Sequence, residues 1–167
     1  MVKYAFIHKG PLQQLLLRDK PEEQMEEIIA ECVKIKRDVV TEDELDLGTR
    51  QLLNFGHTIG HAIEKCSDFS WYHGMAVAVG MAMMLRACRI KGICDEECLE
   101  KAELLLKKFG LPADCEYPAQ ALLEAAMADK KRSGGTITLV LPETFGVCRL
   151  QKTAFEELGE LIALGKR

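Results

Sequence analysis

The sequence lacks the features that mark membrane insertion, secretion or dinucleotide binding. Its 167 residues contain no apolar run close to the ~20 residues that a membrane-spanning helix needs. The first residues do not have the shape of a signal peptide, because their apolar run is short and is interrupted by Lys3. There is no G-x-G-x-x-G motif, and at most two stretches have the composition of strands. A nucleotide-binding βαβ sheet is therefore excluded.

The net charge and the cysteines indicate which partners and which cellular compartment to expect. The net charge of −4 gives no general reason to expect nucleic acid as a partner. The seven cysteines are odd in number, include no C-x-x-C pair and match no standard zinc spacing. Free thiols in a reducing cytoplasm explain this pattern best. We therefore expect a cytoplasmic protein with a single domain over residues 1–167, without nucleic-acid or membrane partners.

Apolar periodicity predicts a mainly α-helical fold. Helices are expected over residues 12–17, 21–33, 50–66, 76–90, 95–110 and 118–129, with a polar segment over 36–50. The helix over 76–90 is apolar nearly all round, which is typical of a helix in the middle of a bundle. Asp95 is the expected N-cap of the following helix, which Gly110 ends.

The periodicity changes near the C-terminus. Residues 136–141 and 147–150 read as strands, separated by a turn over 142–146. Thr153 and Glu156 have the spacing of a capping box for a last helix. The predicted architecture is a multihelical bundle with one small β-hairpin near the C-terminus.

Histidines are concentrated in one short region. His57 and His61 lie four residues apart, and extending their face backwards along one helix gives Asn54 and Arg50. A stripe of Arg, Asn, His and His is unusual for a core face, although satisfied structural histidines remain the alternative. His73 precedes the apolar helix, so its ring can reach a neighbouring helix.

Glycine and threonine near these histidines add two constraints. Gly56 and Gly60 flank His57, and glycine inside a helix is tolerated where a backbone or ligand approaches closely. Thr58 stands where a zinc protease would have its catalytic glutamate, so the sequence does not match HExxH. Two imidazoles are an incomplete zinc set, and a third ligand is needed.

A basic run enters a glycine turn at residues 129–135. Its lysines and arginine provide point charges suited to a phosphate or carboxylate, while a solvated loop is the alternative. Lys3 and Lys36 have no signal of their own.

Three motifs together resemble 3-dehydroquinate synthase. They are RQLLNFGHTIGHAIE from Arg50, HGMAVAVGM from His73 and DKK from Asp129, and the similarity in order and spacing covers the whole chain. That family has an N-terminal NAD-binding domain and a mainly helical C-terminal domain for metal and substrate. The resemblance is to the C-terminal domain only, so the NAD-binding domain is expected to be absent. The family converts 3-deoxy-D-arabino-heptulosonate 7-phosphate to 3-dehydroquinate and phosphate in the shikimate pathway.

The resemblance implies a role for each matching residue. His57 and His73 match the ligands of Zn²⁺ or Co²⁺, and the third ligand, a glutamate, would fall immediately before Met1. Metal binding by the chain itself is therefore expected to be weak or absent. The matches to catalytic positions are His61, Lys3 and Asp46. The matches to substrate-binding positions are Lys36, Arg50, Asn54, His61, Lys130 and Lys131.

Two departures accompany these matches. Asp46 stands where the family commonly has glutamate, which keeps the charge but shortens its reach. Met75 stands where the family often has glutamate, so this chain has no carboxylate at that position.

Three hypotheses follow. The first is the C-terminal domain of a 3-dehydroquinate synthase, inactive alone, whose partners are the sugar-acid phosphate, the NAD-binding domain and, in the intact enzyme, a second copy. The second is a related sugar-phosphate cyclase or metal-dependent polyol dehydrogenase. The third is a non-catalytic helical interaction module.

Overall fold

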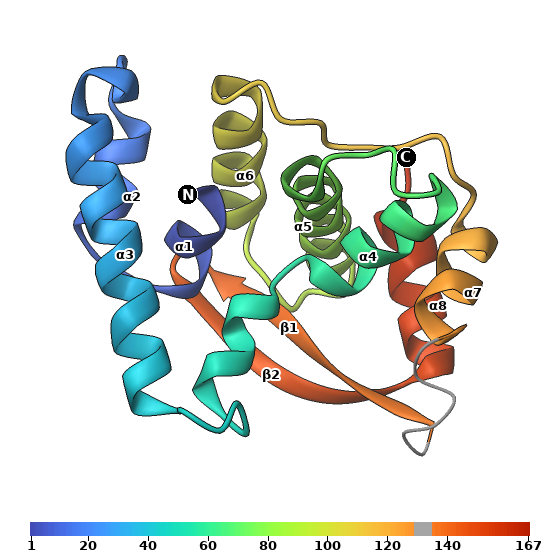
Figure 1. Cartoon of the computed structure of the whole chain (residues 1–167). Coiled ribbons are helices and arrows are strands. Elements are labelled where there is room, and N and C mark those ends of the chain that lie inside the picture. Colours follow the sequence, from blue (N-terminus) through green and yellow to red (C-terminus); the bar gives the residue numbers. More distant parts are fainter. Residues whose placement is uncertain (129–134) are drawn as a thin grey trace.

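The computed structural model describes residues 1–128 and 135–167 (Figure 1). The predicted helical bundle with one hairpin near the C-terminus is confirmed. The helices are α1 (Val2–Ile7), α2 (Pro11–Leu17), α3 (Met25–Glu42), α4 (His57–Cys66), α5 (His73–Ile90), α6 (Glu96–Lys108), α7 (Ala119–Ala128) and α8 (Phe155–Gly165). Two 3₁₀ helices, η1 (Pro21–Gln24) and η2 (Thr49–Asn54), and the strands β1 (Thr136–Thr144) and β2 (Val147–Ala154) complete the described elements.

Helix α5 is the centre of the fold. Every residue from Ala76 to Cys88 is buried, as the apolar composition of this segment predicts. Helices α4, α6 and α8 and strand β1 all contact it. Figure 1 shows α5 between α4 and α6, with the hairpin crossing beside them. The first residue of α5, His73, is thereby held at the end of a rigid central element.

The hairpin is longer than predicted. Strands β1 and β2 pair antiparallel from Thr136 opposite Ala154 to Thr144 opposite Val147, with a register shift between Pro142 and Thr144. Proline is tolerated in a strand at such an irregularity, so Pro142 does not end β1. Gly146 takes a φ of 95° in the turn. The predicted strands, which ended at residues 141 and 150, were therefore too short.

The predicted capping box at Thr153 is wrong. Thr153 belongs to β2, its side chain is buried and its hydroxyl donates to the carbonyl oxygen of Gln151. Ala154 is the N-cap of α8 and has no side-chain cap. By contrast, Asp95 caps α6 as predicted, because its carboxylate accepts from the Cys98 N–H at 2.8 Å.

The predicted polar segment over 36–50 is half helical. Helix α3 continues to Glu42, so Lys36 lies on a helix. Ile28 and Ile35 are buried on it and Val39 packs against the core, which extends the apolar spacing beyond residue 33. After α3, the Asp43 carboxylate accepts from the N–H groups of Leu47, Gly48 and Arg50. These bonds order the loop into η2 and lower the pKa of Asp43, the bond from Gly48 contributing most.

The prediction of one helix over 50–66 is wrong. Gly56 has a φ of 79°, which ends η2 and lets α4 begin at His57. A Cβ on Gly56 would lie 2.7 Å from the carbonyl oxygen of Val77, so glycine is also required by the close approach of α5. The expected close approach of another backbone is therefore confirmed. Arg50 and Asn54 are on η2 and do not continue the histidine face of α4.

None of the helices in the described ranges is long and apolar enough to cross a bilayer.

Candidate metal and substrate site

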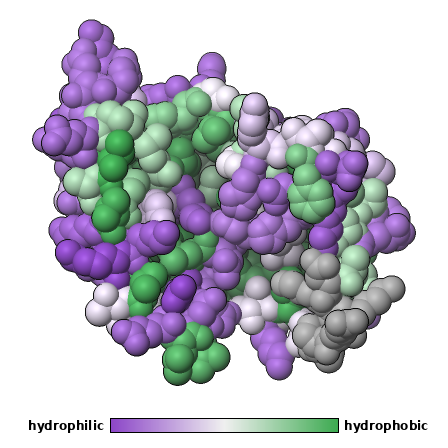
Figure 2. All heavy atoms as spheres, in the orientation of Figure 1, coloured by the Kyte–Doolittle hydropathy of each residue, from purple (hydrophilic) through white to green (hydrophobic). Residues whose placement is uncertain are grey.

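Helices α4 and α5 bring three histidines together. His57 is the first residue of α4, His61 follows one turn later, and His73 is the first residue of α5. Their ring centroids are 5.5 Å apart for His57 and His61, 5.2 Å for His57 and His73, and 5.8 Å for His61 and His73. Figure 2 shows hydrophilic side chains gathered over α4 in the middle of the visible face.

Glycines explain why the two helices approach closely enough. A Cβ on Gly80 of α5 would press on the carbonyl oxygen of Gly56 and lie 3.0 Å from the Gly60 nitrogen. A Cβ on Gly60 would lie 3.1 Å from the Val77 Cα. The missing side chains therefore set the spacing of α4 and α5, and with it the spacing of the histidines.

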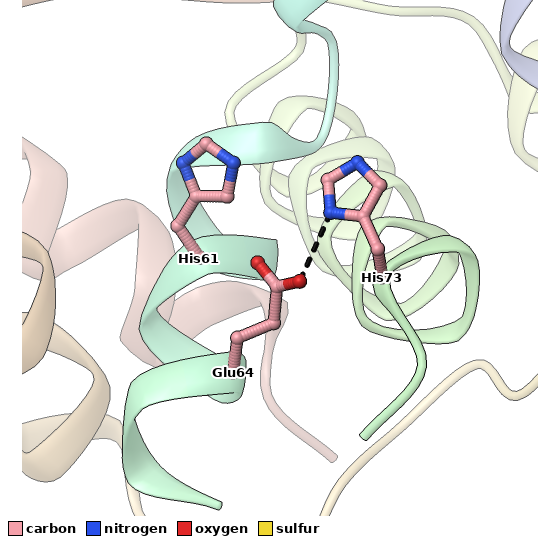
Figure 3. A group of neighbouring side chains, drawn as sticks. All are labelled: His61, Glu64 and His73. Atoms are coloured by element: carbon pink, nitrogen blue, oxygen red, sulfur yellow. Dashed lines mark hydrogen bonds and ion pairs between the residues drawn. The ribbon is translucent and has the colours of Figure 1, made fainter. Parts of the chain in front are cut away.

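Glu64 joins this cluster and is not among the site residues predicted from the sequence. Its Oε1 is 3.0 Å from Nδ1 of His73, across the gap between α4 and α5 (Figure 3). His61, Glu64 and His73 each place one potential ligand atom within 4.8 Å of the others. The signal was present in the sequence, because residues 57, 61 and 64 share one helical face.

The hydrogen bonds of two rings fix where their protons lie. Nδ1 of His57 is 3.1 Å from the carbonyl oxygen of Phe55. A carbonyl can only accept, so this Nδ1 bears the proton and Nε2 has the free lone pair. In the same way, the Glu64 carboxylate accepts a hydrogen bond from Nδ1 of His73, so that Nδ1 bears the proton and Nε2 has the free lone pair. Among the described residues, none forms a hydrogen bond with the His61 ring.

This donor set fits a divalent metal such as zinc. Imidazoles that share a tetrahedral zinc through bonds of about 2.0–2.1 Å have ring centres roughly 5 Å apart. The 5.2 Å between His57 and His73 agrees with that value. A ligating histidine commonly donates its other N–H to a carboxylate or backbone carbonyl, as both rings do here. The ring spacing of His57 and His73 and their occupied Nδ1 atoms are therefore compatible with two imidazole ligands for one ion.

His57 is held neutral by its surroundings. Burial lowers its pKa to about 4, with a further contribution from the Lys3 charge, and the bond to Phe55 only partly opposes this. A neutral imidazole is the form that binds metal.

The lowered pKa of His57 makes stability depend on pH. In the metal-free protein, the unfolded chain takes up a proton near pH 6.5 while folded His57 resists protonation until about pH 4. We expect the free energy of unfolding to fall as the pH is lowered from 6.5 to 4, and this contribution to be absent in His57→Gln. Urea unfolding at pH 4.5 and pH 7 measures it. An identical pH dependence in both proteins would contradict the assignment.

Two cavities border the histidines. One of about 380 Å³ is lined by Lys3, His57 and His73, together with apolar residues. The other, of about 290 Å³, is lined by Asn54, His57 and His61 among others. His57 thus faces both, and each cavity has room for a small polar molecule.

Lys3 reaches this region from α1. Its Nζ donates to the carbonyl oxygen of Leu53 at 2.6 Å. Burial lowers the pKa of Lys3 to about 8, and the nearby Lys36 charge adds to the effect. Lys36 itself is exposed on α3. The two lysines therefore form a positive region beside the histidines.

The other residues predicted for the site lie away from the three histidines or outside the described residues. Arg50 donates to the Glu44 carbonyl oxygen at 2.9 Å and lines neither cavity. Asp46 is exposed in the loop before η2 with a φ of 57°. Lys130 and Lys131 lie outside the described residues.

The fold is shared with about half of each of two synthases whose structures contain NAD⁺ and a divalent metal. A 2-deoxy-scyllo-inosose synthase crystallised with carbaglucose-6-phosphate, NAD⁺ and Co²⁺ matches 97% of this chain with a TM-score of 0.78 and 22% identity, over 49% of its own length. The 2-epi-5-epi-valiolone synthase of Streptomyces hygroscopicus, with NAD⁺ and Zn²⁺ bound, matches 98% with a TM-score of 0.81 and 19% identity, over 47% of its length.

Sequence comparison then gives the family. The 3-dehydroquinate synthase C-terminal family matches residues 1–132, and the chain belongs to it. The 3-dehydroquinate synthase of Clostridium kluyveri is 37% identical over 95% of the chain, and that of Clostridium perfringens strain SM101 is 39% identical over 93%. The chain spans about half the length of these curated relatives, namely 46% of each.

Proposed function

We propose that this chain is the metal- and substrate-binding half of a 3-dehydroquinate synthase, which converts 3-deoxy-D-arabino-heptulosonate 7-phosphate to 3-dehydroquinate and phosphate. The observation that supports this most is the meeting of His57, His73 and Lys3 at one cavity, in a chain that belongs to this family.

His57 and His73 would hold Zn²⁺ or Co²⁺ through their Nε2 atoms. When bound, the ion supplies Lewis acidity that polarises a substrate alcohol. His61 is exposed one turn from His57, where its ring can donate or accept a proton. Lys3 and Lys36 supply positive charge for a carboxylate or phosphate, and Asn54 supplies an amide at the second cavity.

We also propose roles in substrate binding and proton transfer for residues that line neither cavity. Arg50 has a guanidinium suited to bidentate binding of a carboxylate, and Asp46 a carboxylate for proton transfer. Lys130 and Lys131 are proposed substrate contacts that supply positive charge to a carboxylate or phosphate. The NAD-dependent steps belong to a second domain, which is the proposed partner in a cytoplasmic homodimeric enzyme.

Relatives favour the synthase over other cyclases. Proteins 37–39% identical to the chain are 3-dehydroquinate synthases, whereas the 2-deoxy-scyllo-inosose and 2-epi-5-epi-valiolone synthases are only 19–22% identical. A substrate with a carboxylate is also the better match to the basic residues Lys3, Lys36 and Arg50.

Calorimetric titration of the zinc-loaded chain with 3-deoxy-D-arabino-heptulosonate 7-phosphate tests the proposal. We expect binding that weakens by about 10-fold or more in Lys3→Met, because a charged hydrogen bond contributes about 1.5–3 kcal/mol. Lys20→Met is the control, since Lys20 is exposed and its ion pair among the described residues is with Glu23 at the surface. Glucose 6-phosphate, which has no carboxylate, should bind more weakly.

Two results would contradict the proposal. One is equal binding of both phosphates, which would favour a different cyclase. The other is phosphate release by the chain with zinc and NAD alone, because the NAD-dependent steps would then not require a second domain.

A further inference from the structure

Glu64 occupies an unusual position for a carboxylate. Its side chain is only 14% exposed, whereas the ring of His73 that it contacts is 55% exposed. A carboxylate that is largely withdrawn from water requires compensating hydrogen bonds. Figure 3 shows the carboxylate extending from α4 towards His73 at the beginning of α5. The bond to Nδ1 of His73 is therefore the main compensation that the described residues provide.

Two roles are compatible with this position. In the first, Glu64 binds the metal directly together with His61 and His73, whose ligand atoms lie within 4.8 Å. In the second, Glu64 accepts the Nδ1 proton of His73 and leaves Nε2 for the metal. The first role makes the carboxylate itself a ligand of the ion, while the second uses the 3.0 Å hydrogen bond to Nδ1 as it stands.

His57 favours the second role. Its Nδ1 is held by the Phe55 carbonyl in the same way, so both rings have the same nitrogen occupied. Their centroids are also the closest of the three histidine pairs. A fixed Nδ1 on each ring makes the two Nε2 atoms available to one ion between α4 and α5.

We infer that Glu64 is a positioning residue that fixes the tautomer and orientation of His73, so that Nε2 of His73 is directed to the metal shared with His57. This inference rests on the proposed metal pair. An anionic acceptor on Nδ1 also makes the ring a stronger ligand, and such partners typically change metal affinity by about 10- to 100-fold.

Zinc affinity, measured by competition with a chromogenic chelator, separates the two roles. Glu64→Ala should weaken zinc binding by about 10- to 100-fold. Glu64→Gln should restore part of the affinity, because a neutral amide oxygen still accepts from Nδ1–H and fixes the tautomer but lacks the negative charge. The matched control is Glu160→Ala. It removes a carboxylate of α8 that pairs with Lys91, and it should leave the zinc affinity unchanged. Equal losses in Glu64→Ala and Glu64→Gln would overturn the inference in favour of direct ligation.

Nitrogen-15 NMR of the metal-free chain provides a second readout. His73 should be mainly the Nδ1–H tautomer in the wild type and in Glu64→Gln, and should shift towards the Nε2–H tautomer that water favours in Glu64→Ala. His57 should not change. An unaltered His73 tautomer in Glu64→Ala contradicts the role of Glu64. Unaltered zinc affinity in His57→Ala instead contradicts the metal pair, so the two failures are distinguishable.

Discussion

Replacing Gly80 by alanine is expected to lower the free energy of unfolding by about 2–3 kcal/mol, in the range for overpacking a closely packed interior. The added Cβ would press on the carbonyl oxygen of Gly56 and lie 3.0 Å from the backbone nitrogen of Gly60. Both obstacles are backbone, so no side chain can rotate away and α4 must move from α5. Urea denaturation followed by circular dichroism measures the loss.

Gly74→Ala is the matched control for Gly80→Ala. Gly74 is on the same helix, but a Cβ there meets no atom within 4 Å. Alanine is a better helix former than glycine by about 1 kcal/mol, so stability should be unchanged or slightly raised. Ordinary surface substitutions change the free energy of unfolding by less than about 0.5 kcal/mol. If the free energy of unfolding of Gly80→Ala is within that range of the wild-type value, the close contact of α4 and α5 is contradicted.

Removing His57 is expected to weaken zinc binding more than removing any residue that does not bind the metal directly. His57→Ala takes away one of two proposed imidazoles, so the affinity should fall by more than the roughly 10- to 100-fold that loss of a supporting residue causes. His61→Ala is the matched control, because its ring lies 5.5 Å from His57 and forms no hydrogen bond to another described residue. Its affinity for zinc should change little. Calorimetric titration compares the three proteins, and a larger loss in His61→Ala would contradict the assignment.

The helices and the hairpin were predictable from apolar periodicity, but several boundaries were not. Helix α5 is buried on all sides from Ala76 to Cys88, and the nearly continuous apolar sequence of this segment indicates that directly. Gly56, in contrast, has a positive φ and meets Val77 at 2.7 Å, a tertiary contact that no local pattern contains. The break at Gly56 is the reason that Arg50 and Asn54 do not share the histidine face.

The candidate site shows the same division. The spacing of His57 and His61 placed both on one helical face, and the position of His73 before an apolar helix suggested contact with a neighbour. The structure brings all three together. The lowered pKa of Lys3 depends on burial and on Lys36, which is 33 residues away in sequence and adjacent only in the fold. Glu64 was on the predicted face, but its partner is on another helix.

X-ray absorption spectroscopy of the zinc-loaded chain tests the proposed metal site most directly, because the scattering from imidazole rings reports how many histidines bind the ion. With zinc below one equivalent, the wild type should show two imidazoles at about 2.0–2.1 Å together with oxygen ligands. His57→Ala should show one. Two imidazoles retained in His57→Ala would mean that His61 and His73 hold the metal, and would contradict the pair formed by His57 and His73.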